Sequence, residues 1–239
     1  MTPGTFGRVT IAMFVAVAMA GRIQAQHAHE ETAAQAAAPQ AAVGDPYPLA
    51  TDPVSGQKLG DHPVIVKHEG RELRFANQAN AQKFRADPAM YLARLDKALI
   101  ADQLPRYPLE TCIVAGGPLG GMGEPVNVIY NNRLVRFCCS GCIGTFRDKA
   151  AEFIARLDAA VIEKQSRDYA LKTCPVSGED LGGMGEVVQR VVANQLVRLC
   201  CAGCVDGLNR NPAEVMAKVR GQTAPATAPA EAGHTQHSH

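Results

Sequence analysis

All eight cysteines of this 239-residue chain belong to one motif that occurs twice. The sequence CCSGC at 138–142 returns as CCAGC at 200–204, and a lone cysteine precedes each run at the same spacing, Cys112 and Cys174. Soft thiolates favour zinc, Cu(I) and related ions over calcium or magnesium. The chain must therefore fold so that sulfur atoms distant in sequence can meet, and metal binding is the first hypothesis for it.

The repeat extends beyond the cysteines. Residues 107–161 align without a gap with the residues from 169 onward, and both copies contain the sequence GGMGE. A further copy begins at Tyr47 and aligns once two residues are deleted from the glycine-rich loop of the later copies. This copy has no cysteine, and its residues Asp52, Ala76, Asn77 and Asn80 stand at the positions of Cys112, Cys138, Cys139 and Cys142. A period of roughly 60 residues indicates a row of similar small units.

Each copy has the pattern of a β-hairpin followed by helix. Apolar residues alternate with polar or smaller ones over 126–130, Asn131 and Asn132 mark a tight turn, and a strand-like run resumes over 134–138. After Cys142 the apolar spacing becomes helical. An Asx residue followed by proline marks helix starts at Pro88 and Pro212.

The sequence therefore predicts an α+β protein of three tandem small units. Each unit is a loop plus a β-hairpin followed by one or two short helices, with boundaries at 47–101, 107–162 and 169–220. Units this small have little core and are commonly stabilised by a metal, a disulfide or a neighbour. The helix that follows the second strand would offer its positive end to the cluster Cys138, Cys139 and Cys142 and favour their thiolates.

The two ends of the chain have a different composition. Residues 1–25 have the charge and apolar pattern of an export signal peptide, with an apolar stretch too short to cross a bilayer. Residues 26–46 and 221–239 are rich in Ala, Pro, Gln and Thr, and we expect them to be disordered. They hold the histidines His27, His29, His234, His237 and His239, which either capture metal loosely or are solvated tail residues.

The export signal predicts a periplasmic or secreted protein with no membrane span after its removal. Oxidising compartments favour disulfides, and the cysteines of each copy could also form bridges. Because neighbours such as Cys138 and Cys139 do not readily bond to each other, each would need another partner. Metal and disulfide therefore compete for the same sulfur atoms.

The copies resemble the YHS and TRASH families of small metal-associated modules, which have a treble-clef-like fold. The resemblance rests on Phe137-Cys138 with Cys142 and Phe146 after it, and on the run CIVAG that begins at Cys112. The last copy repeats this pattern with CPVSG, and the first copy is similar to a cysteine-free YHS unit through DPVSG and ADPAMY. The resemblance covers the chain apart from its signal and tails.

The resemblance implies metal ligands at Cys112, Cys138 and Cys142 in one site and at Cys174, Cys200 and Cys204 in the other. Where a four-thiolate finger would have another cysteine, this chain has Ala115 and Ser177. Cys139 and Cys201 are either the replacement ligands or buried apolar residues. Met122 and Met184 are either soft ligands for Cu(I) or, as we favour, side chains that fill gaps in the core.

Other functions are less favoured by the composition. A formal net charge of +1 without a basic block argues against nucleic-acid partners. No catalytic set repeats with the cysteines, so we expect neither catalytic residues nor an organic cofactor. His62 and His68, near Asp52 and Asn80, have no repeated ligand spacing and are expected to be structural.

We therefore expect a non-catalytic, exported protein that binds copper or zinc at up to two thiolate sites. Its role would be metal trafficking, resistance or buffering, with a metal-transport or efflux protein as a partner. The alternatives are a periplasmic thiol-disulfide redox protein, because Cys139 and Cys142 form a C-x-x-C at a helix start, and a structural interaction module stabilised by disulfides or zinc.

Overall fold

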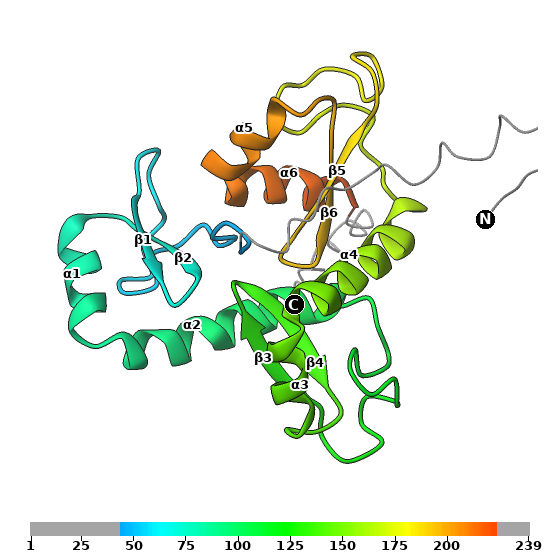
Figure 1. Ribbon diagram of the computed structural model, residues 1–239. Helices are drawn as coiled ribbons and strands as arrows, with labels where there is room; N and C mark the ends of the chain where they lie inside the picture. The colour runs from blue at the N-terminus through cyan, green and yellow to red at the C-terminus, as the bar shows by residue number, and fades with distance from the viewer. Residues whose placement is uncertain (1–43, 224–239) are drawn as a thin grey trace, which may run out of the picture. The chain divides into compact units, whose positions relative to one another are not determined.

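The computed structural model describes residues 44–223 (Figure 1). The predicted signal peptide, residues 26–43 of the predicted linker and residues 224–239 of the predicted tail lie outside the described residues, together with their five histidines. The described residues all belong to one compact unit. None of the helices within 44–223 is both long enough and apolar enough to cross a membrane.

The architecture is α+β, as predicted, and the order hairpin, helix, helix occurs three times along the described chain (Figure 1). The first segment contains β1 (Val64–His68), β2 (Arg71–Phe75), α1 (Gln78–Ala86), α2 (Pro88–Gln103) and a 3-10 turn, η2 (Leu104–Arg106). The middle segment contains β3 (Val126–Tyr130), β4 (Arg133–Phe137), α3 (Cys142–Asp148) and α4 (Ala150–Ser166). The last segment contains β5 (Val188–Val192), β6 (Gln195–Leu199), α5 (Cys204–Arg210) and α6 (Pro212–Thr223).

Every hairpin is a two-stranded antiparallel sheet closed by a two-residue turn in the left-handed region. In the middle hairpin Val126 pairs with Phe137 and Tyr130 with Arg133. Its turn residues Asn131 and Asn132 have φ values of 48° and 69°. Asparagine tolerates this conformation better than most residues, so the predicted asparagine turn and the hairpin around it are confirmed.

The helix starts also follow the sequence signals. α2 begins at Pro88, and the side chain of Asp87 caps it by accepting a hydrogen bond from the Met90 N–H. α6 begins at Pro212. The helices run further than the predicted units: α2 reaches Gln103, α4 reaches Ser166 and α6 enters the predicted tail. The connectors between segments are therefore largely helical.

The core consists of one cluster per segment, built from equivalent positions. In the first segment Phe75 of β2 packs on Phe84 of α1 with ring centroids 5.3 Å apart. In the middle segment Phe137 packs on Phe146 at 5.4 Å. Leu199 and Leu208 occupy these positions in the last segment and are also buried. The second strand of each hairpin is thereby fixed against the helix that follows it.

A glutamine joins each long helix to the next hairpin, buried at Gln103 and half-buried at Gln165. Gln103, at the end of α2, donates to the carbonyl of Asn132 at 2.9 Å and accepts from the Leu134 N–H at 2.8 Å. Gln165, at the end of α4, makes the same pair of bonds with Asn194 and Leu196. Because backbone groups of both turns are satisfied in this way, the three segments are held to one another in series.

A second link is the ion cluster around Arg133, which is 3% exposed. Its guanidinium contacts the carboxylates of Asp45 and Asp158. Burial alone would lower the pKa of Arg133, but the two carboxylates raise it above its usual value. Asp45 also accepts the Ala193 N–H of the last hairpin at 2.7 Å. Asp45 lies within the predicted linker, and in the structure it contacts both later segments.

Candidate metal centres

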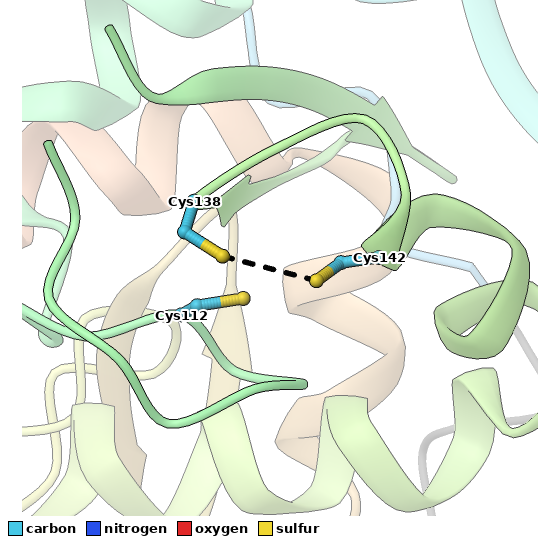
Figure 2. A group of neighbouring side chains, drawn as sticks. All are labelled: Cys112, Cys138 and Cys142. Atoms are coloured by element: carbon cyan, nitrogen blue, oxygen red, sulfur yellow. Dashed lines mark hydrogen bonds between the residues drawn. The ribbon is translucent and has the colours of Figure 1, made fainter. Parts of the chain in front are cut away.

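Three cysteines of the middle segment meet at one point, which we call the middle site (Figure 2). Cys112 comes from the loop before β3, Cys138 follows β4, and Cys142 is the first residue of α3. Their sulfur atoms all lie within 4.8 Å of one another, and Cys138 Sγ is 3.9 Å from Cys142 Sγ. All three side chains are buried. The family resemblance implied this same trio, and the structure brings it together.

The last segment repeats the arrangement in what we call the C-terminal site. Cys174, Cys200 and Cys204 lie within the same 4.8 Å of one another, and Cys200 Sγ is 3.7 Å from Cys204 Sγ. These side chains are also buried. Within residues 44–223, these two trios are the groups of Cys, His, Asp or Glu side chains that come close enough to hold a metal ion.

Sulfur separations in both sites suit a metal ion. A tetrahedral zinc with Zn–S bonds of about 2.3 Å requires sulfur atoms about 3.8 Å apart. The separations of 3.9 Å and 3.7 Å lie close to this value. All eight cysteines are free in the structure. The donor set and its spacing therefore fit a thiophilic ion such as zinc.

The loop that carries the first ligand is a tight turn. In the middle segment Gly117 accepts the Cys112 N–H and Gly116 donates to the Cys112 carbonyl, both at 2.8 Å. Gly116 has a φ of 72°, which a residue with a side chain rarely adopts. Cys174 and Gly178 form the same turn, with a φ of 82° at Gly178. Glycine at this position allows the chain to reverse its direction next to the cysteine sulfur.

Backbone N–H groups in this turn point at the Cys112 sulfur. The Ala115 N–H lies 3.4 Å from Sγ. Burial raises the pKa of the Cys112 thiol, but hydrogen bonds from the N–H groups of Ala115, Cys138 and Val114 outweigh it and lower the pKa to about 7. In the C-terminal site the equivalent bonds, with the Ser177 hydroxyl, lower the pKa of Cys174 to about 6. One sulfur of each site is thus prepared as a thiolate.

The helix start was expected to favour the thiolates that cluster there, and it does so at Cys139 and Cys201. Hydrogen bonds from the Gly141 N–H lower the pKa of Cys139, and hydrogen bonds from the Cys204 N–H lower that of Cys201. Cys142 and Cys204 differ, because burial and the neighbouring thiols raise the pKa of each to about 12. A thiolate buried among other sulfur atoms loses its hydration and is repelled by negative charge on its neighbours, so the protonated thiol is favoured. A metal ion supplies the missing positive charge, so metal binding would release the protons of these thiols.

The cysteine-free segment keeps the same N–H cradle and fills it with a carboxylate. Asp52, at the position of Cys112, accepts the N–H groups of Val54, Ser55 and Ala76 at 2.7, 3.0 and 2.7 Å. The amide of Asn80, at the position of Cys142, donates to Asp52 at 2.9 Å. Hydrogen bonds therefore hold the first segment where sulfur atoms meet in the others.

Asp52→Ala is expected to lower the free energy of unfolding at pH 7 by about 2–4 kcal/mol, because several buried donors lose a charged acceptor. Burial raises the pKa of Asp52, but the bonds from Ala76, Ser55, Asn80 and Val54 outweigh it and hold the pKa below its usual value. The carboxylate therefore stabilises the fold above the unfolded pKa of about 3.9, and this contribution disappears as pH falls through the folded value. Urea unfolding at pH 7 and in acid checks this: a gap between the two proteins that persists in acid would contradict it.

Cys139 and Cys201 lie beside the sites rather than within the mutual 4.8 Å groups. Both are half-buried. Cys201 Sγ is 3.9 Å from Cys200 Sγ and 3.8 Å from Cys204 Sγ, so it borders two sulfurs of the C-terminal site. Both side chains pack against the apolar cores of their segments. They lie at the edge of the thiolate groups, and their role as ligands stays a prediction.

We expected Met122 and Met184 to fill gaps in the core, but the structure shows that they do not. They are 73% and 65% exposed in the glycine-rich loops. Those loops need glycine at positions of positive φ, for example 93° at Gly120 and 89° at Gly182. In the first segment the ring of His68 packs edge-on against Phe84 at 5.2 Å, which confirms its structural role, and His62 is exposed.

One contact to a ligand was missed by the sequence argument. The Ser177 hydroxyl lies 3.3 Å from Cys200 Sγ, whereas the middle segment has Ala115 at the same position. The replacement of alanine by serine in otherwise similar turns was the available signal. A hydroxyl beside a thiolate adds a hydrogen bond, so the two sites are alike in their sulfur atoms but differ in their surroundings.

Comparisons with known protein families, with curated proteins and with solved structures find no match for this chain.

Proposed function

We propose that the chain is an exported, non-catalytic protein that binds a copper or zinc ion at each of two thiolate sites. The observation that carries the proposal is the pair of buried cysteine trios, each with its sulfur atoms within 4.8 Å of one another. Metal trafficking, resistance or buffering is the role we infer, with a metal-transport or efflux protein as the partner. We further propose that the three hairpin-and-helix segments are tandem units of the YHS or TRASH kind.

The cysteines of one site differ in pKa, and this difference determines the order in which they would bind the ion. Cys112 or Cys174 would bind first, because backbone N–H groups already favour its thiolate. Cys142 or Cys204, whose pKa is raised by burial, would then lose its proton as the ion approaches. Ions with no affinity for sulfur would not offset the cost of burying these thiolates, so the sites select soft or borderline metals.

Metal content of the purified full chain, measured by native mass spectrometry under reducing conditions, tests the proposal. We expect up to two ions per chain, one fewer after Cys142→Ser or Cys204→Ser, and none in the double variant. Met122→Ala and Met184→Ala are matched controls, because they remove exposed sulfurs outside the trios and should leave the metal content unchanged. Wild-type metal content in the double serine variant would overturn the proposal.

The identity of the metal is settled by competition. Three thiolates favour Cu(I) as a soft ion, and a further sulfur would complete a tetrahedral zinc site. Titration of the reduced protein with Cu(I) and Zn(II) against chelators of known affinity gives the two dissociation constants directly. An ion whose binding does not depend on Cys112 and Cys174 is not the native one.

A thiol-disulfide redox function is the second candidate. It is favoured by Cys201, a half-buried thiol whose sulfur lies 3.8 Å from that of Cys204. The same mass spectra distinguish the two functions, because each disulfide removes a pair of hydrogen atoms whereas each bound ion adds its own mass. A redox protein would also exchange disulfides with glutathione and keep that activity after metal removal.

A further inference from the structure

Cys139 and Cys201 are more accessible to solvent than the other cysteines of the two sites. Each site has three buried sulfurs and one neighbouring thiol, Cys139 or Cys201, that solvent reaches. In the C-terminal site that thiol lies 3.9 and 3.8 Å from two of the three buried sulfurs. These separations match an edge of a tetrahedral thiolate site, so an ion held by the trio would also lie next to Cys201.

A glycine lies next to the sulfur of each of these half-buried cysteines. A Cβ atom added to Gly141 would be 3.7 Å from Cys139 Sγ, and one added to Gly203 would be 3.8 Å from Cys201 Sγ. Neither glycine is required by the backbone, because both have ordinary helical angles, with φ of −61° and −62°. Glycine also has the highest entropic cost of folding of any residue. Because glycine has no side chain, each of these glycines leaves the approach to the neighbouring sulfur uncovered.

The residues before these glycines are also small and exposed, Ser140 in one site and Ala202 in the other. Every other sulfur of the two sites is buried. A second thiolate could therefore reach a bound ion along the edge formed by Cys139 or Cys201 and its glycine.

We propose that Cys139 and Cys201 are exchange ligands through which the bound ion passes to an acceptor that presents cysteine thiolates. This inference rests on the proposed metal-binding function and adds the route by which the ion leaves. The incoming thiolate sulfur forms a bond to the metal while the bond between the metal and Cys139 or Cys201 breaks. The displaced thiolate takes up a proton from water, and the metal keeps its oxidation state throughout.

The glycines allow a test that leaves every sulfur in place. In the Gly141→Leu, Gly203→Leu variant the new side chains cover the exposed sulfurs. The metal content and equilibrium affinity should stay within about threefold of the wild type. The second-order rate constant for transfer of the ion to glutathione should fall by about tenfold or more, which corresponds to a barrier higher by about 1.4 kcal/mol.

Substitutions of increasing size at Gly141 and Gly203 distinguish the proposed effect from misfolding. Gly141→Ala with Gly203→Ala adds only a Cβ at ordinary contact distance and should slow transfer less than the leucine pair does. Spontaneous loss of the ion, measured as the rate extrapolated to zero glutathione, should be the same in all variants. A transfer rate that does not change along this series, with metal content retained, overturns the inference. A wild-type protein without metal would instead overturn the proposed function itself.

Discussion

Saturation with its metal is expected to raise the thermal unfolding midpoint of the reduced, full-length protein by roughly 15–30 °C. An ion that binds the native state at a free concentration 1,000 times its dissociation constant adds about 4 kcal/mol per site, and there are two sites. The sulfur atoms of each trio come from a loop, a strand end and a helix start. Unfolding separates these three elements and abolishes the site.

Calorimetry with and without metal measures this shift. The Cys204→Ser variant should keep about half of it, because the middle site still binds one ion. Asp52→Ala is the matched control: it should lower the midpoint of both forms and leave the shift itself unchanged, since the first segment is held by hydrogen bonds. A midpoint that does not depend on metal would mean that the trios do not bind in the folded state.

Arg133→Met is expected to lower the free energy of unfolding by about 3–5 kcal/mol, because it leaves the half-buried carboxylates of Asp45 and Asp158 without their buried partner. It also removes the bond from Arg133 to the Val191 carbonyl at 2.8 Å, which ties the middle hairpin to the last one. Urea unfolding at neutral pH and constant ionic strength measures the loss.

An exposed ion pair supplies the control for this prediction. Arg167 lies 4.0 Å from Glu163, and their side chains are 80% and 79% exposed. Arg167→Met should therefore cost no more than about 1 kcal/mol. Combining Arg133→Met with Asp45→Asn and Asp158→Asn should recover part of the loss, because no unpaired charge is then buried. Equal effects of Arg133→Met and Arg167→Met would show that the buried cluster does not hold the segments together.

The hairpins and their turns could be predicted because the information is local. Alternating apolar residues over 126–130 and the Asn131-Asn132 pair are features of neighbouring residues, and the structure forms that strand and that turn. The proline helix starts at Pro88 and Pro212 are equally local. The ends of the helices were less predictable, because Gln103 and Gln165 are fixed by the following hairpin rather than by their own neighbours.

The cysteine trios were predictable only in part. Spacing and resemblance identified Cys112, Cys138 and Cys142, and the repeat supplied the equivalent trio. The position of Cys139 at the edge depends on how the chain turns after β4, which two adjacent cysteines in a sequence do not specify. The sequence also did not reveal the lowered pKa of the Cys112 thiol, because it depends on backbone N–H groups that converge on Cys112 from separate parts of the chain.

The sequence by itself determined the duplication, the sulfur donors and the hairpin-and-helix order, since repeats, residue types and turn signals are properties of the linear chain. Only the tertiary structure decided that Asp52 fills the cradle that Cys112 and Cys174 occupy elsewhere, and that Asp45 and Arg133 join segments far apart in sequence. The physical reason is the same in each case. A buried charge is tolerated only where partners from separate parts of the chain meet around it, and that meeting exists only in the folded chain.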